Sequence, residues 1–192
     1  HTEEIIQAGK NIAPGFGGIT LDAISAPGGF EFADRLKEML DIPVFHDDQH
    51  GTAIVVLAGI INGLRVTGKK KEDCRVVVNG AGSAGVAITK LLLTYGFKHV
   101  TMCDREGIIG KDYPNLNWMQ KKMTEVTNLE NASGTLADAL RGADIFVGVS
   151  APNIVTPEMV SSMNKDAILF AMANPVPEII QDVAKAAGEK VV

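Results

Sequence analysis

Four titratable side chains stand together in the stretch HDDQH, directly before a long apolar run. Three kinds of chemistry suit these residue types. Asp47 or Asp48 can cap a helix that begins near Gly51, because a carboxylate accepts hydrogen bonds from the free N–H groups of a first helical turn. His46 and His50 lie four positions apart, a spacing that binds zinc when both lie on one helix. The two carboxylates can instead belong to a site for Mg²⁺ or Mn²⁺ that a bound substrate completes.

The residues IPVF before His46 indicate a short buried strand, which places His46 outside the helix and weakens the zinc alternative. The capping and carboxylate-site alternatives remain open at this point.

A second motif with chemical meaning is the glycine pattern in NGAGSAG, which follows an apolar strand and opens a helix. An acidic residue, Asp104, ends the next strand, and the combination is the fingerprint of a dinucleotide-binding site. Gly80 permits the tight turn, Gly82 lets the backbone approach a pyrophosphate, and Gly85 lets helix and strand pack closely. A glycine turn without a ligand is the alternative interpretation.

The first turn of this helix contains Ser83 and Ala84, whose N–H groups and helix dipole favour bound phosphates. Asp104 can accept hydrogen bonds from the ribose hydroxyls of adenosine, and its charge repels a 2′-phosphate, which favours NAD. NADP remains possible because the adjacent Arg105 can pair with that phosphate.

Two later strands end in VGVSAPN and AMANPVP. Ligands of open α/β sheets lie beyond the carboxyl ends of the strands, so we expect Asn153 and Asn174 at the cleft. An amide there can hold a carboxamide or a carboxylate. Both residues can also be simple turn residues, since Asn near Pro is common in loops.

The net charge of −5 argues against nucleic acid or an anionic membrane as a main partner, because both require a basic face. Cys74 and Cys103 fall in or beside strand-like runs, and we expect buried thiols in a cytoplasmic protein and not a disulfide. No signal peptide is visible at the first residues. The apolar run TAIVVLAGIINGLRV is shorter than the roughly 20 residues of a membrane span, so we expect a buried helix.

Strands and helices alternate along the chain, which predicts right-handed βαβ units. The expected fold class is α/β, a Rossmann-like doubly wound, mostly parallel sheet with helices on both faces. One of the expected helices covers VPEIIQDVAKAAG. We expect residues 1–45 to be the end of a preceding domain or a connecting segment, and residues 46–192 to be the NAD(P)-binding domain. The start at His1 and the end at AAGEKVV suggest a fragment of a longer polypeptide.

Five stretches together resemble the bacterial type of malic enzyme: FGGITLDAISAP, IPVFHDDQHGTAIVVLAG, VVVNGAGSAG, GVSAPNIVTPEMVSSM and FAMANPVPEI. The resemblance runs from about residue 3 to residue 188 and corresponds to the later part of that family's chain. It implies oxidative decarboxylation of malate to pyruvate and CO₂ with reduction of NAD(P), assisted by Mg²⁺ or Mn²⁺. It also implies a homodimer, with Asn153 and Asn174 holding the nicotinamide or the malate.

The resemblance further implies that three carboxylates bind the metal: an adjacent Glu-Asp pair after FGGI, and the second Asp of the DD pair. The last corresponds to Asp48, with Asp47 as its neighbour or a proton carrier. Here the first pair reads Asp22-Ala23, so Asp22 takes the Glu position and Ala23 brings no ligand atom. The metal ligands expected from this chain are Asp22 and Asp48.

Similar proteins take a Tyr acid and a Lys base from an earlier domain, and neither Tyr95 nor Tyr113 stands in a matching context. We therefore expect the isolated chain to be inactive, supplying the cofactor site and part of the metal site. The alternative is a non-catalytic NAD-binding or assembly module. A dehydrogenase of the amino-acid type would need a lysine base near the cleft, and none stands in the expected contexts.

Overall fold

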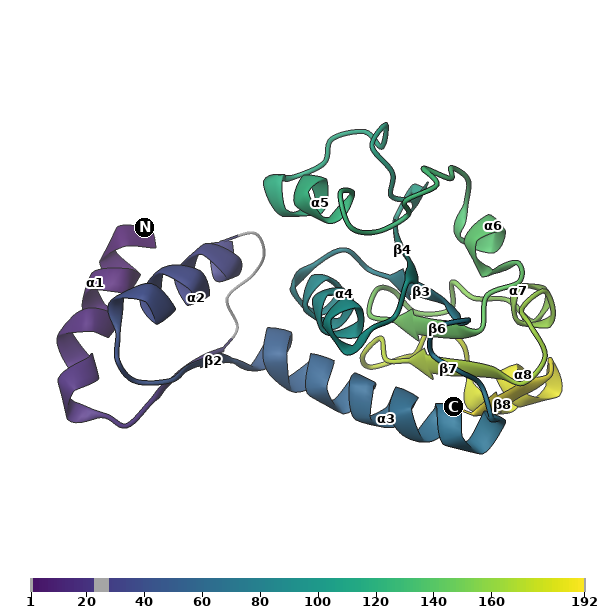
Figure 1. Ribbon diagram of the computed structural model, residues 1–192, viewed down its shortest axis with the longest axis horizontal. Helices are drawn as coiled ribbons and strands as arrows, with labels where there is room; N and C mark the ends of the chain where they lie inside the picture. Colours follow the sequence, from purple (N-terminus) through teal and green to yellow (C-terminus); the bar gives the residue numbers. More distant parts are fainter. Residues whose placement is uncertain (1, 23–27, 192) are drawn as a thin grey trace.

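The computed structural model describes residues 2–22 and 28–191 (Figure 1). The helices are α1 (Thr2–Ile12), α2 (Gly28–Met39), α3 (Thr52–Thr67), α4 (Ser83–Tyr95), α5 (Trp118–Met123), α6 (Leu136–Leu140), α7 (Pro157–Ser161) and α8 (Gln181–Ala186). The strands are β1 (Ile19–Leu21), β2 (Val44–His46), β3 (Arg75–Asn79), β4 (His99–Asp104), β5 (Gly107–Ile108), β6 (Ile145–Gly148), β7 (Ala167–Ala171) and β8 (Glu189–Val191). A 3₁₀ turn, η1 (Ala13–Gly15), follows α1, and a π-helical turn, η2 (Asp47–Gly51), leads into α3.

The main sheet has six strands in the order β5-β4-β3-β6-β7-β8. Strands β4, β3, β6, β7 and β8 are parallel, and only the short β5 runs antiparallel, against the end of β4. Strands such as β6 are continuous apolar runs because both faces of the sheet are covered. The chain winds outward in both directions from β3 and β6, so a ligand crevice is expected at their carboxyl ends.

Helices cover both faces of this sheet, which confirms the doubly wound α/β class. Val76 and Val78 of β3 face the side that α3 and α4 cover. Val77 faces the opposite side, where it packs in one core with residues of α6, α7 and α8. The alternation follows from the two-residue period of a strand, and it fixes the direction in which each strand presents its end.

A small lobe precedes the main sheet and contains α1, α2 and the parallel pair β1–β2 (Figure 1). It has its own buried cluster, which includes Ile6, Leu36 and Val44. The register pairs Leu21 with His46, so the residues that follow β1 and β2 emerge at the same edge. The domain boundary at residues 45 and 46 stays a prediction.

Two expectations about helices need correction. The helix expected over residues 176–188 is only α8, because Pro177 cannot donate a backbone hydrogen bond and Glu178 turns into the protein interior. The run after HDDQH does form a helix, but it is only partly buried: Ile54 and Val55 are 56% and 68% exposed. It covers one face of the sheet only, so its outer face has no partner among the described residues.

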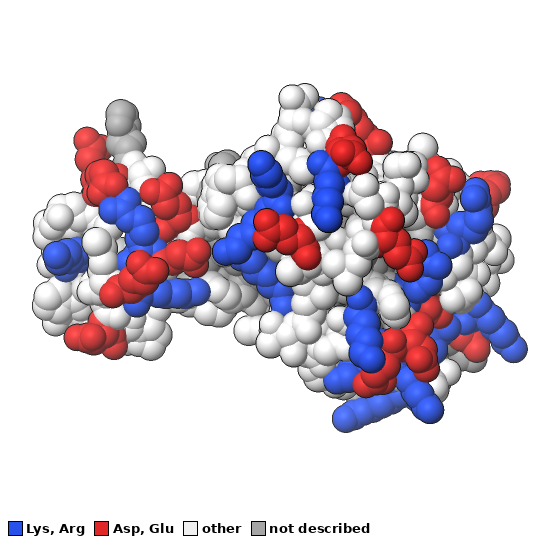
Figure 2. Space-filling model, turned by 45° about the horizontal axis from the view of Figure 1, so that its top comes forward, with Lys and Arg blue, Asp and Glu red and all other residues white. Residues whose placement is uncertain are grey.

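Among the described residues, the helical run Asp47–Thr67 is long and apolar enough to cross a membrane by length and composition. A core helix of a soluble protein passes the same test, so this property alone is weak evidence for a span. Figure 2 shows acidic and basic side chains interspersed over one face of the molecule. Cys74 and Cys103 are both buried free thiols, as expected.

Candidate functional site: a dinucleotide cleft at the carboxyl ends of the strands

The glycine loop joins β3 to α4 in a tight turn. Gly80 has a φ of 116°, a left-handed conformation that favours glycine, and its N–H donates to the carbonyl of Cys103 at 2.9 Å. A Cβ on Gly80 would lie 2.5 Å from the carbonyl oxygen of Val149. A Cβ on Gly85 would overlap the carbonyl oxygen of Gly80, so helix and strand could not approach this closely. The turn and packing roles expected of these two glycines are therefore visible in the structure.

The N-terminus of α4 presents backbone N–H donors beside the glycine loop. Gly82 occupies the N-cap position and supplies no side-chain cap. The N–H groups of the first turn have no partner within the helix. A Cβ on Gly82 would meet no atom within 4 Å, so the space in front of this turn is open. The hydroxyl of Ser83 is buried and without a hydrogen-bond partner among the described residues. Residues 80–85, the glycine loop and the first turn of α4, thus form an open cradle of N–H donors. This cradle fits a pyrophosphate.

The carboxylate of Asp104 lies at the end of β4, beside the cradle. Its Oδ1 accepts the N–H of Arg105 at 2.8 Å, and its Oδ2 accepts from Nε2 of Gln120 at 3.2 Å. The residue is only partly buried and lines a cavity of about 500 Å³. This volume lies in the range of roughly 300–1,000 Å³ that is typical of small-molecule sites.

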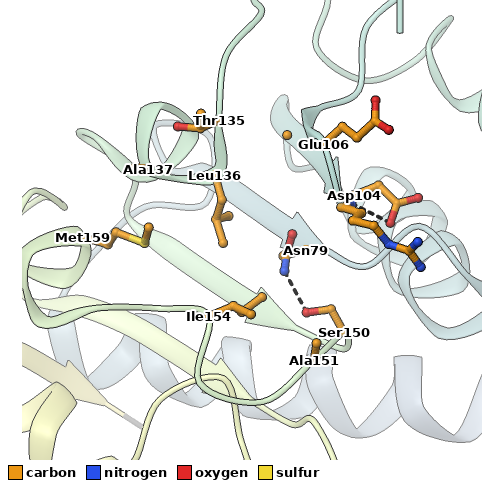
Figure 3. Close-up of a pocket in the computed structure, with 12 residues that line it drawn as sticks. Asn79, Asp104, Glu106, Thr135, Leu136, Ala137, Ser150, Ala151, Ile154 and Met159 are labelled. Carbon is orange, nitrogen blue, oxygen red and sulfur yellow. Dashed lines mark hydrogen bonds between the residues drawn. The ribbon is translucent and has the colours of Figure 1, made fainter. Parts of the chain in front are cut away.

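The cavity opens where β3, β4 and β6 end, at the switch point of the sheet. Figure 3 shows Leu136, Ile154 and Met159 on the side away from Asp104. An apolar wall opposite a carboxylate suits a flat base with an attached ribose. The cavity, the glycine loop and the open helix end together fit the adenosine and pyrophosphate parts of a dinucleotide.

A polar chain that the sequence did not predict crosses the same strand ends, with the buried side chains of Asn79 and Glu178 at its ends and the exposed Ser150 between them. Asn79 Nδ2 donates to Ser150 Oγ at 2.7 Å (Figure 3), and Ser150 Oγ donates to Oε1 of Glu178 at 3.1 Å. Glu178 has no exposed surface, and its Oε2 accepts the N–H of Ala173 at 3.0 Å. The only signal in the sequence is a carboxylate set among apolar residues in VPEII.

The two expected asparagines lie on neighbouring loops. The N–H of Asn153 donates to the carbonyl of Pro177 at 3.0 Å, which joins the loop after β6 to the loop after β7. Asn153 has a φ of 57°, a conformation that Asn tolerates in turns. Both Asn153 and Asn174 are exposed, and neither lines the cavity beside Asp104. Their contact with a nicotinamide or a substrate stays a prediction.

The stretch HDDQH forms the end of β2 and the turn η2. No side-chain cap is present at the start of η2 or of α3, so the capping alternative is wrong. The zinc alternative also finds no support. The ring of His46 is completely buried, whereas Asp47 and Asp48 are exposed. The ring of His50 accepts the N–H of His46 at its Nδ1, at 2.9 Å.

The predicted metal ligands come from neighbouring strands, since Asp22 follows β1 and Asp48 follows β2. Both side chains are exposed, and no group of three or more His, Cys, Asp or Glu in the described part of the chain could hold a metal ion. Ala23 lies outside the described residues, and its side chain has no oxygen atom. Mg²⁺ requires six oxygen ligands in near-octahedral geometry. The residues present therefore do not fit a preformed divalent metal site.

The sheet order, the glycine loop and the cavity beside Asp104 define a Rossmann-like dinucleotide-binding domain. Residues 49–191 match the family model described as "Malic enzyme, NAD binding domain". The chain is 54% identical over 186 residues to the NAD-dependent malic enzyme of Geobacillus stearothermophilus, with 96% of this chain and 38% of that protein covered. It is 48% identical to the bifunctional malic/malolactic enzyme of Bacillus subtilis, covering 99% of this chain and 47% of that protein.

Among solved structures, the NAD-dependent malic enzyme of Thermotoga maritima superposes with a TM-score of 0.97 at 47% identity. The match covers 100% of this chain and 52% of that one. The chain belongs to the malic enzyme family and corresponds to its NAD-binding domain. It spans about half or less of the length of these relatives. Other relatives are NADP-dependent malic enzymes, among them that of Haemophilus influenzae.

Proposed function

We propose that this chain is the cofactor-binding part of an enzyme that converts malate to pyruvate and CO₂ with reduction of NAD. One observation carries the proposal: the open glycine cradle and the carboxylate of Asp104 lie at the same strand ends, in a chain of the malic enzyme family. Asp104 favours NAD over NADP because a fixed negative charge repels a 2′-phosphate.

The bound dinucleotide would supply the hydride acceptor. The chain's own residues would bind and orient it. The N–H groups of Ser83 and Ala84 bind the pyrophosphate, and Asp104 accepts from the ribose hydroxyls. Asn153 and Asn174 hold the nicotinamide or the malate through their amides. We further propose that the whole protein forms a homodimer. We also propose that it is cytoplasmic, because the two free thiols of this chain suit a reducing compartment.

A steady-state assay of the whole protein with malate, Mn²⁺ and NAD tests this function. We expect pyruvate and reduced NAD to form in equal amounts, whereas the 192-residue chain binds NAD without turnover. A whole protein that binds NAD but forms no pyruvate from malate would contradict the proposed activity.

The second candidate is a non-catalytic NAD-binding or assembly module, which the two-carboxylate set of Asp22 and Asp48 favours. Calorimetric titration of the whole protein with Mn²⁺, in the presence of NAD and malate, separates the two. Submillimolar metal binding supports the enzyme, and NAD binding without metal binding supports the module.

A further inference from the structure

Glu178 places a carboxylate inside the protein without a cation beside it. Its side chain has no exposed surface, and it forms no ion pair in the described part of the chain. The N–H and the Oγ–H of Ser150 donate to its Oε1 at 2.9 and 3.1 Å, and the N–H of Ala173 donates to its Oε2 at 3.0 Å. An ionised carboxylate only accepts hydrogen bonds, so these neutral donors suit the charged form and leave its negative charge in place.

The carboxylate of Glu178 lies between the loops that follow β6 and β7. Ser150 belongs to the first loop and lines the cavity (Figure 3), whereas Ala173 belongs to the second loop and directly precedes Asn174. The N–H of Val155 donates to the backbone carbonyl of Glu178 at 3.1 Å, which joins the two loops at a further point. The negative charge is therefore fixed at the carboxyl ends of these two strands.

This end of the crevice is the side that faces the second nucleotide of a bound dinucleotide. A dinucleotide lies across the crevice at the switch point of the sheet, with one nucleotide on each side. Asp104 ends β4 and suits the adenosine ribose, so the nicotinamide half faces the ends of β6 and β7. The nicotinamide ring is positively charged in oxidised NAD and neutral after it accepts a hydride. A fixed negative charge nearby attracts the oxidised ring, because charges inside a protein are screened less than charges in water.

We propose that Glu178 favours oxidised NAD over NADH in the candidate site through the charge of its carboxylate. It acts on the ring through the electric field and not through contact. The difference makes NADH the form that leaves more readily once the hydride has been transferred. This inference rests on the proposed dinucleotide-binding function and gives a role to a buried acid that lies outside the glycine motif.

Two variants separate the charge of Glu178 from its shape. Glu178→Gln keeps the length of the side chain but removes the charge. Glu178→Asp keeps the charge but shortens the side chain, so it weakens the hydrogen bonds from Ser150 and Ala173. Calorimetric titration of each chain with oxidised NAD, NADH and ADP-ribose gives three affinities. ADP-ribose lacks the nicotinamide and reports on the adenosine and pyrophosphate parts alone, and urea unfolding checks that each variant is folded.

We expect E178Q to lower the ratio of NAD affinity to NADH affinity about fivefold or more, and to keep the ADP-ribose affinity within about twofold of the unaltered chain. E178D should keep the original ratio of NAD to NADH affinity. An unchanged ratio in E178Q, or an equal change of the ratio in E178D, would overturn the inference. So would an equal loss of affinity for all three ligands in E178Q, which marks a purely structural role. If the unaltered chain binds none of the three ligands, the proposed function itself is refuted, and this inference with it.

Salt provides a second test, on the unaltered chain, if E178Q does not fold. Interactions between exposed charges weaken strongly as salt rises, whereas those of buried charges are screened much less. The ratio of NAD to NADH affinity should therefore change less than about threefold between about 0.05 and 0.5 M NaCl. A larger change would assign the discrimination to exposed charges and contradict the role proposed for Glu178.

Discussion

The carboxylate of Glu178 holds Ser150 at two points, accepting its N–H at 2.9 Å and its Oγ–H at 3.1 Å. A Cβ on Gly148 would overlap this carboxylate, so the glycine at the end of β6 makes room for it. The pair joins the loops that follow β6 and β7, which carry Asn153 and Asn174. The shape of this side of the cleft therefore depends on one buried acid.

Glu178→Ala should lower the free energy of unfolding by about 2 kcal/mol or more, because the N–H groups of Ser150 and Ala173 lose their acceptor. Urea unfolding at pH 7 measures the loss. Glu125→Gln, which changes an exposed carboxylate, is the control and should stay within about 0.5 kcal/mol of the unaltered chain. Equal stabilities of E178A and the unaltered chain would show that the loops hold together without the acid.

Many strands, turns and helix starts could be predicted because they depend on the local sequence. The apolar run before NGAGSAG predicted β3, and the glycines predicted the turn into α4. Thr156 is the N-cap of α7 and Pro157 is its first helical residue, an arrangement that residue type alone favours. The local pattern also gave one wrong prediction: the apolar spacing in VPEII predicted a helix, whereas Pro177 and the inward turn of Glu178 impose a loop there.

The polar contacts around the cleft could not be predicted from one sequence. Gln120 lies in a polar stretch without a readable motif, and its partner Asp104 is on another element. Ser150 and Asn79 look like ordinary strand-end residues until the sheet order brings them together. Such contacts depend on strand order and loop path, which local periodicity does not encode.

Asp144 anchors the opposite end of the sheet and should make stability depend on acid pH. Burial acts to raise the pKa of Asp144, but donors from Lys69, Arg75 and Asn164 outweigh it, so the pKa lies below its ordinary value. A lowered pKa in the folded state contributes stability above the unfolded value near 3.9, and this contribution is lost as the pH falls through the folded pKa.

Asp144→Asn should therefore cost about 1.5–3 kcal/mol at pH 7 and flatten the loss of stability below about pH 4. Urea unfolding from pH 2 to pH 7 measures both effects. Asp73→Asn, at an exposed position, is the control and should leave the loss of stability at acid pH unchanged. If D144N loses stability at acid pH as steeply as the unaltered chain, Asp144 is not the origin of the pH dependence.

The two thiols should be inert in the native state. Burial raises the pKa of Cys103 to about 12 and that of Cys74 to about 11, so almost no thiolate is present at pH 8. A colorimetric disulfide reagent should modify neither thiol in native buffer and both in denaturant. Rapid modification of one thiol per folded chain would contradict the burial of Cys74 or Cys103.

Restoring the carboxylates after β1 should strengthen metal binding. The double change Asp22→Glu with Ala23→Asp adds the oxygen ligands that Mn²⁺ prefers. We expect the Mn²⁺ affinity to rise about tenfold or more in calorimetric titrations, and the further change Asp48→Asn to cancel that gain. If the double variant binds Mn²⁺ no better than the unaltered chain, Asp48 and the residues after β1 do not share a metal site.

Calorimetric titration of NAD into the unaltered chain and into Gly82→Ala tests the dinucleotide site most directly. The backbone of Gly82, with φ −89°, suits alanine, and a Cβ there would meet no atom within 4 Å, so the urea midpoint should not change. We expect one NAD per unaltered chain and an affinity at least about tenfold lower in G82A, because the methyl group occupies the space through which the pyrophosphate approaches the backbone. Equal NAD affinities in the two chains, or no binding to the unaltered chain, would contradict the proposed dinucleotide site.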